Sequence, residues 1–271
     1  MKTSKAGGLI DLGDRERVQE RHPLLIAHRG GVITPTTPEN SLAAIRLAAD
    51  RGYDMVELDI RRAKDGEPVM FHDWEGNLLT SCGVRVAVRD LTRDEISATR
   101  YVGTDEPIAM LEQGLALCRS LELGVMLDIK SLGDTQDSET FLKTIGRLLR
   151  EHDLSGAVLA WGHPLERRHL ADTAMFPVSD EDTHQAIGGR PVSLDGQYWF
   201  GPAQHLSVTA LQALQRRGVL VFAAINTFLY PVRAHVEPAR HDIERFLDVG
   251  IDGFQIDSVY EDFFGTLHAG G

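Results

Sequence analysis

Residues 24–30 read Leu-Leu-Ile-Ala-His-Arg-Gly, an apolar run that ends in the ionisable side chains His28 and Arg29. The pattern recurs three times. Residues 55–60 read Met-Val-Glu-Leu-Asp-Ile, residues 69–73 read Val-Met-Phe-His-Asp, and residues 125–130 read Val-Met-Leu-Asp-Ile-Lys. Continuous apolar runs of this length are typical of strands buried on both faces of a parallel sheet. The sequence therefore predicts an α/β fold.

Eight apolar runs alternate with amphipathic helical stretches. The predicted strands are Leu24–Ala27, Met55–Ile60, Val69–Phe71, Val125–Ile129, Ala157–Trp161, Pro191–Leu194, Val219–Ile225 and Gly253–Ile256. The predicted helices are Ser41–Arg51, Ile108–Leu121, Thr140–His152, Ser207–Arg217 and Asp242–Val249. Eight strands with intervening helices in a chain of 271 residues favour a single-domain (β/α)₈ TIM barrel. An open doubly wound sheet is the alternative, although no dinucleotide or P-loop glycine pattern occurs.

The chain divides into two predicted regions. Residues 1–22 are polar and are expected to form an extension outside the barrel, and residues 23–265 are expected to form the barrel. The stretch 73–107 is longer than an ordinary βα connection. We expect it to form a modest excursion after the third predicted strand, with a short helix at Arg93–Thr99.

Composition limits the classes of partner. The formal net charge of −12 disfavours nucleic acid and anionic membranes, because both attract basic surfaces. No signal peptide and no apolar run of about 18 residues is present, so we expect a cytoplasmic protein without stable membrane insertion. Cys82 and Cys118 lack metal-ligand spacing; buried thiols are expected, and a disulfide stays open.

Three carboxylates follow the predicted strands at the positions where a site would form. The carboxyl ends of parallel barrel strands share one rim. Side chains alternate along a strand, so Glu57 and Asp59 face the same side, and Asp128 and Lys130 do so on their own strand. Converging carboxylates repel one another, and a hard divalent cation with oxygen ligands would bind at Glu57, Asp59 and Asp128.

Two histidines end apolar runs at the same predicted rim. Imidazole titrates near neutral pH, so His28 and His72 are candidates for proton transfer. Arg29 has the planar guanidinium that suits a phosphate oxygen, and Lys130 adds positive charge. These groups together predict chemistry on a small anionic substrate.

The motifs that carry this pattern occur in a fixed order. They are AHRG at 27–30, PENS at 38–41, ELDI at 57–60 with KDG at 64–66, FHD at 71–73, MLDIK at 126–130, VFAAIN at 221–226 and GIDGFQID at 250–257. This ordered set resembles the glycerophosphodiester phosphodiesterase family over roughly residues 24–260.

The resemblance implies a TIM-barrel hydrolase that cuts glycerophosphodiesters to glycerol 3-phosphate and an alcohol, usually with Mg²⁺ or Ca²⁺. By resemblance, His28 and His72 match the catalytic pair, and Glu57 and Asp59 match metal ligands. Arg29 matches a phosphate-contacting arginine, and Lys130 the lysine of the family's ExK motif. The family's proposed route passes through a cyclic phosphate formed by the neighbouring glycerol hydroxyl.

Two residues depart from the family pattern. Asp128 stands where the family has Glu, so its carboxylate is one methylene shorter. Ala223 aligns with a family tryptophan, which predicts a wider pocket unless Trp161, Trp199 or Phe228 fills it. The departures bear on substrate preference more than on the reaction.

Several alternatives remain open. A phospholipase D-like phosphodiesterase acting on lysolipids is one, and an apolar groove at the rim would favour it. A barrel that only binds a phosphate ligand is another. Zn²⁺ or Mn²⁺ could replace Mg²⁺ or Ca²⁺. We expect Glu39 and Asn40 to cap the following helix, with a site role as the alternative. Asp257, at the end of the last predicted strand, fits a buried polar role and a catalytic role equally well.

Overall fold

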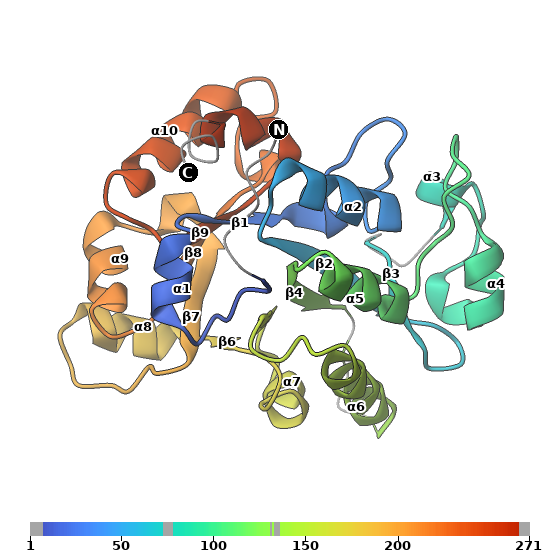
Figure 1. Cartoon of the computed structure of the whole chain (residues 1–271), viewed down its shortest axis with the longest axis horizontal. Coiled ribbons are helices and arrows are strands. Elements are labelled where there is room, and N and C mark those ends of the chain that lie inside the picture. The colour runs from blue at the N-terminus through green and yellow to red at the C-terminus, as the bar shows by residue number, and fades with distance from the viewer. Residues whose placement is uncertain (1–7, 73–77, 131, 133–135, 266–271) are drawn as a thin grey trace.

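Eight parallel strands form the centre of the fold, in the order β5–β4–β2–β1–β9–β8–β7–β6 (Figure 1). A computed structural model of the chain describes residues 8–72, 78–130, 132 and 136–265. The strands are β1 (Leu24–Ala27), β2 (Met55–Arg62), β4 (Gly124–Ile129), β5 (Val158–Ala160), β6 (Phe176–Pro177), β7 (Gln197–Pro202), β8 (Leu220–Ile225) and β9 (Gly253–Ile256).

The two ends of this strand order meet. Leu159 of β5 and Met175, directly before β6, form a parallel bridge, which brings the ring of strands close to closure. Most of the helices surround the strands (Figure 1). They are α2 (Leu42–Arg51), α5 (Leu111–Ser120), α6 (Gln136–Glu151), α7 (Pro164–His169), α8 (Asp180–Ile187), α9 (Val208–Gln215) and α10 (Val236–Leu247). The predicted TIM barrel is confirmed, and the open sheet was the wrong alternative.

Two of the predicted strands do not form part of the barrel. The run at Val69–Phe71 forms β3 (Pro68–Met70), which pairs antiparallel with the end of β2 and lies outside the ring. The stretch Pro191–Leu194 forms no strand; β7 begins at Gln197 instead. The prediction also missed β6, because a strand of two residues is too short to produce a periodic signal.

Two helices begin earlier than predicted. Helix α6 starts at Gln136 rather than Thr140, and α10 starts at Val236 rather than Asp242. Pro238 concealed the start of α10. It occupies the first turn, where a helix does not need the missing N–H. The expected short helix in the excursion is present as α4 (Arg93–Ala98).

The excursion packs as a small unit on the outer side of β3. It contains α3 (Leu79–Cys82), the 3₁₀ turn η2 (Val88–Asp90) and α4, which lie beyond the helix ring (Figure 1). Its buried apolar residues, including Leu78, Val88 and Ile96, form a separate cluster with Val69 and Phe71. Cys82 and Cys118 are both buried and free.

The N-terminal segment packs against the barrel. Helix α1 (Arg15–Glu20) places Val18 in a buried cluster that also contains Ile10 and Leu12. This cluster includes Met55 and Leu220, which begin β2 and β8, so the segment covers the amino ends of the strands. Within the described residues, none of the helices has the length and apolar character needed to span a membrane.

The alternation along β2 positions the site. Val56, Leu58 and Ile60 belong to the large core cluster that includes the helix-layer side chains, whereas Met55 lies in the cluster at the amino ends of the strands. Glu57 and Asp59 share the Met55 side of the strand. Both carboxylates therefore lie inside the barrel, toward the carboxyl ends of the strands.

Candidate active site

Three carboxylates from two neighbouring strands meet inside the barrel. Glu57, Asp59 and Asp128 each offer an oxygen, and these oxygens lie within 4.8 Å of one another. Glu57 and Asp59 are each 2% exposed. The register of β2 with β4 pairs Asp59 directly with Asp128, so the sheet geometry itself brings the carboxylates together.

The electrostatics of this group favour a bound cation. Burial raises the pKa of Glu57 well above its usual range, and the charges of Asp59 and Asp128 raise it further. Lys130 forms ion pairs with Asp59, at 2.9 Å, and with Asp128. One ammonium against three carboxylates leaves negative charge uncompensated. The donor set of three clustered carboxylate oxygens fits a hard divalent cation.

The Asn40 side chain holds Asp59 in place. The sequence had instead favoured a helix-capping role for Asn40. The Asn40 side chain donates to Asp59 Oδ2 at 2.8 Å and accepts from the Asp59 backbone N–H at 3.0 Å. The cap of α2 is Ser41, whose hydroxyl accepts from the Ala44 N–H. The expected capping role of Asn40 is therefore wrong. The motif PENS contained a signal for this contact, because it places a second polar side chain, Asn40, directly before the capping residue Ser41.

The turn after β1 is shaped by Arg29 and two glycines. Arg29 has φ 56°, and its backbone N–H donates to Glu57 Oε2 at 2.7 Å. A Cβ on Gly30 would lie 2.6 Å from the Asn40 Cα, so this backbone approaches the start of α2 very closely. The conformation of the His-Arg-Gly-Gly stretch thus fixes both the Arg29 amide and Asn40 beside the carboxylates.

Glu39 connects two of the predicted site residues. Its Oε2 accepts from Arg29 Nη1 at 3.0 Å, and its Oε1 lies 3.5 Å from His72 Nδ1. The preferred capping role for Glu39 is therefore also wrong. Arg29 Nε is buried and, among the described residues, has no hydrogen-bond partner. The Arg29 side chain is 32% exposed and lines a pocket, so its planar guanidinium suits a phosphate oxygen.

His28 is held by Asp257. Its Nδ1 lies 2.6 Å from Asp257 Oδ1, while the other oxygen, Oδ2, accepts from the Thr227 backbone N–H at 2.6 Å and from the Thr227 hydroxyl at 2.7 Å. Burial alone would raise the pKa of Asp257, but its hydrogen bonds with His28 and Thr227 lower it to about 2. Asp257 therefore remains ionised near neutral pH.

His72 has different surroundings. Its backbone carbonyl accepts from Arg61 Nη2 at 2.8 Å, which positions the chain as it leaves β3. Burial lowers the pKa of His72, partly against the charge of Asp59. Asp73, the other polar residue of this motif, lies outside the described residues.

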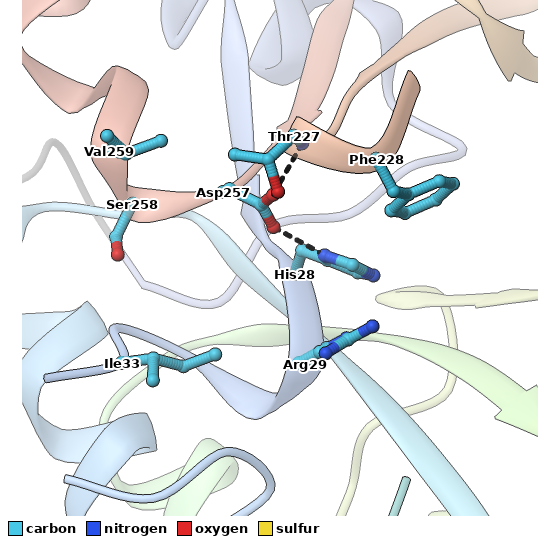
Figure 2. A pocket seen from close by; sticks show the side chains of 8 residues that line it. All are labelled: His28, Arg29, Ile33, Thr227, Phe228, Asp257, Ser258 and Val259. Carbon is cyan, nitrogen blue, oxygen red and sulfur yellow. Dashed lines mark hydrogen bonds and ion pairs between the residues drawn. The ribbon is translucent and has the colours of Figure 1, made fainter. Parts of the chain in front are cut away.

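A pocket of about 280 Å³ opens beside His28 and Arg29 (Figure 2). Its wall combines Thr227 and Asp257 with apolar side chains from three different connections. Those side chains are Ile33, Phe228 and Val259, which are 40%, 67% and 56% exposed. The Phe228 ring lies 6.0 Å from the His28 ring, centre to centre. An apolar wall thus borders the groups suited to proton transfer and phosphate binding.

The two departures from the family pattern have different structural settings. Asp128 lies in the carboxylate cluster despite its shorter side chain. Ala223 is fully buried in the large core cluster and does not line the pocket. Of the three aromatics considered as substitutes for an indole, Phe228 lines the pocket. Trp161 instead packs edge-on against Phe200, with ring centres 5.4 Å apart.

The arrangement as a whole suits a phosphodiester. The two histidines are linked through Arg29. His28 directly precedes Arg29 in the chain, and Glu39 contacts both Arg29 and His72. The carboxylate cluster adjoins them through the Arg29 amide. Two imidazoles and a guanidinium beside a carboxylate cluster are groups that can carry out acid–base cleavage of a phosphodiester.

Residues 28–144 match the model of the "Glycerophosphoryl diester phosphodiesterase family". This segment of the chain is similar to that family. The matched segment contains the predicted catalytic, phosphate-binding and metal-binding residues from His28 to Lys130, and Asp257 lies outside it.

Curated members of the family share moderate identity with part of the chain. Human "Glycerophosphodiester phosphodiesterase 1" is 38% identical over 113 residues, which cover 39% of this chain and 33% of the human protein. Mouse "Lysophospholipase D GDPD1" is 39% identical over 171 residues, which cover 59% of this chain and 50% of the mouse protein. The chain thus spans a third to a half of the length of these relatives.

Solved structures of the family share the fold over most of the chain. A putative glycerophosphoryl diester phosphodiesterase from Silicibacter pomeroyi has a TM-score of 0.68 at 18% identity, with 91% of this chain and 92% of that chain covered. An Oleispira antarctica phosphodiesterase in complex with the product sn-glycerol-3-phosphate has a TM-score of 0.67 at 18% identity, with coverages of 90% and 96%. These likenesses confirm the barrel fold.

Proposed function

We propose that the chain hydrolyses glycerophosphodiesters to glycerol 3-phosphate and an alcohol, with a divalent cation at Glu57, Asp59 and Asp128. One observation carries the proposal: contacts through Arg29 connect both histidines to the carboxylate cluster at a single rim. The match of residues 28–144 to the family model adds support, as does the glycerol 3-phosphate bound by the Oleispira antarctica phosphodiesterase of similar fold.

The proposed reaction has two steps, and His28 and His72 act in each. In the first, one histidine takes the proton of the glycerol hydroxyl next to the phosphate, and that oxygen bonds to phosphorus. The bond to the alcohol oxygen breaks, and the other histidine protonates the leaving oxygen. In the second, water opens the cyclic phosphate with the proton transfers reversed, giving glycerol 3-phosphate.

The charged residues around the histidines bind and orient the phosphate in this proposal. The Arg29 guanidinium, which lines the pocket, donates to a phosphate oxygen. Lys130 holds Asp59 and Asp128 by ion pairs and adds positive charge near the substrate. A divalent cation, when bound, supplies Lewis-acid polarisation of a phosphoryl oxygen. Mg²⁺ or Ca²⁺ is the proposed ion, since all three ligands are carboxylates.

Metal dependence is the test of this proposal. Protein stripped with a chelator should release no glycerol 3-phosphate from glycerophosphodiesters, and added Mg²⁺ or Ca²⁺ should restore release. Glu57→Gln should lower the restored rate by about 10²-fold, because it removes a charged ligand from the cluster. The measurement is enzymatic detection of glycerol 3-phosphate with Mg²⁺, Ca²⁺, Mn²⁺ and Zn²⁺ added one at a time.

Glu151→Gln is the matched control. It also removes one acidic group, but from the exposed C-terminal end of α6, and should retain the wild-type rate. Full activity of the folded protein after chelation would contradict the cation proposal. No release with any metal, from folded protein, would contradict glycerophosphodiesterase activity and favour the phosphate-binding barrel.

A lysolipid substrate is a second candidate, favoured by the apolar side of the pocket. Ile33, Phe228 and Val259 come from three connections and remain substantially exposed beside His28. An acyl chain covering these side chains would remove apolar surface from water, which stabilises the complex. We therefore include lysophospholipase D activity as the alternative substrate class.

Phe228→Ala separates the two substrate classes. If lysophospholipids are used, the variant should lose about tenfold in kcat/KM on lysophosphatidylcholine, because it loses apolar contact area. Its kcat/KM on glycerophosphocholine should change much less. Val102→Ala, which trims an exposed apolar side chain outside the pocket lining, should leave both values unchanged. Equal losses on both substrates would contradict an acyl-chain role for Phe228.

A further inference from the structure

Asp257 meets His28 because of the register between the first and last strands. β1 pairs with β9 in parallel, and Ala27 lies opposite Ile256. His28 and Asp257 are the next residues on each strand. The contact between Nδ1 and Oδ1 at 2.6 Å therefore follows from the barrel geometry rather than from a flexible loop.

Thr227 fixes which oxygen of Asp257 faces the imidazole. Both Thr227 donors, the backbone N–H and the hydroxyl, point at Oδ2, and only Oδ1 faces His28 (Figure 2). The Asp257 backbone N–H donates in turn to the Ile225 carbonyl at 3.3 Å. The carboxylate is thus held from two sides and has little freedom to rotate.

We propose that Asp257, anchored by Thr227, is a positioning residue for His28: it keeps the proton of the neutral imidazole on Nδ1 and leaves Nε2 as the acceptor. This inference rests on the proposed function. An ionised carboxylate has no proton to donate, so the imidazole N–H must point toward it. Figure 2 shows the second ring nitrogen on the edge of the ring away from Asp257.

Within the described residues, His72 has no equivalent arrangement. The His72 Nδ1 lies 3.5 Å from Glu39 Oε1, and Glu39 is shared with Arg29. That distance is at the limit of a hydrogen bond, so the contact constrains the imidazole less. The two histidines therefore differ in how firmly the protein sets their orientation.

Asp257→Asn gives a sharp test, because the amide has only one suitable orientation. Both Thr227 groups are donors, so the amide oxygen must face Thr227, and the amide NH₂ must face His28 Nδ1. The amide then donates to Nδ1 and moves the imidazole proton to Nε2. We expect this change of tautomer in ¹⁵N–¹H NMR spectra of histidine-labelled protein, with kcat reduced about 10²-fold and KM nearly unchanged.

Further variants separate positioning from general stability. Thr227→Val removes the hydroxyl but keeps the backbone N–H, and should lower kcat by less than tenfold. Thr227→Ser keeps both donors and should resemble the wild type. Asp252→Asn is the control, since Asp252 accepts from the Val221 N–H at the amino end of β9, the end opposite to the one that carries Asp257. It should lower the melting temperature without changing the tautomer or kcat.

A failure of this inference can be distinguished from a failure of the proposed function, because the NMR measurement requires no turnover. A tautomer change in Asp257→Asn supports the positioning role, even if no phosphodiester is cleaved, in which case the proposed function fails instead. An unchanged His28 tautomer in a folded Asp257→Asn variant overturns the inference. So does an equal loss of kcat in Asp252→Asn.

Discussion

Replacing His28 or His72 with alanine is expected to lower kcat on a glycerophosphodiester by about 10³–10⁴-fold. Each variant removes one of the two groups that transfer protons in the proposed reaction. Both imidazoles are partly exposed, at 13% and 19% of the side chain, so the barrel should stay folded. Steady-state kinetics with circular dichroism on the same samples provide the measurement.

His152→Ala is the matched control for this prediction. His152 follows α6, near the amino ends of the strands and far from the rim that carries the site. Its removal should leave kcat within about twofold of the wild type, since surface substitutions rarely have larger effects. Wild-type-like activity in both His28→Ala and His72→Ala would contradict the acid–base assignment.

Gly31→Ala is expected to have the largest effect on stability. Gly31 has φ 140°, and a Cβ there would lie 2.2 Å from the Ala44 carbonyl oxygen and 2.4 Å from its carbon. The obstacle is helix backbone, which cannot move aside as a side chain could. We expect the free energy of unfolding, measured by urea denaturation, to fall by about 3–5 kcal/mol.

Gly52→Ala separates steric overlap from backbone conformation. Gly52 ends the same helix with φ 88°, and no heavy atom lies within 4 Å of a Cβ built on it. Only the left-handed conformation opposes alanine there, at a cost of about 1 kcal/mol. Similar losses in the two variants would contradict the close-approach explanation for Gly31.

The barrel was predictable where strands are buried on both faces. β1, β2, β4, β8 and β9 have near-continuous apolar runs, and their positions were predicted to within two residues. β3 has the same apolar character, but its antiparallel pairing with β2 depends on tertiary contacts that an isolated run does not encode. β7 contains Gly201 and Pro202 and starts at a polar Gln197, so its composition resembles a loop.

The site was predictable where side chains follow strand alternation. Glu57, Asp59 and Asp128 could be placed together because a strand has a period of two and parallel strands share a rim. Asn40 could not, since its side chain reaches Asp59 from a loop whose path depends on the left-handed backbone at Arg29 and Asn40. Loop trajectories of this kind have no sequence period.

Asp257 shows a different limit of sequence reasoning. Its place at the end of a strand was visible, but its partner was not, because 229 residues separate it from His28. The contact depends on the pairing of β1 with β9, which brings the first and last strands of the barrel side by side.

Ring closure has a consequence for the order in which the protein forms during synthesis. A nascent chain carries both histidines, Arg29 and the carboxylates well before β9 leaves the ribosome. Until then β1 has an unpaired edge, and His28 lacks its partner on the last strand. Joining segments so distant in sequence is slow, since the loop-closure entropy must be overcome first. The pairing that joins the first strand to the last is therefore also the one that completes the surroundings of His28.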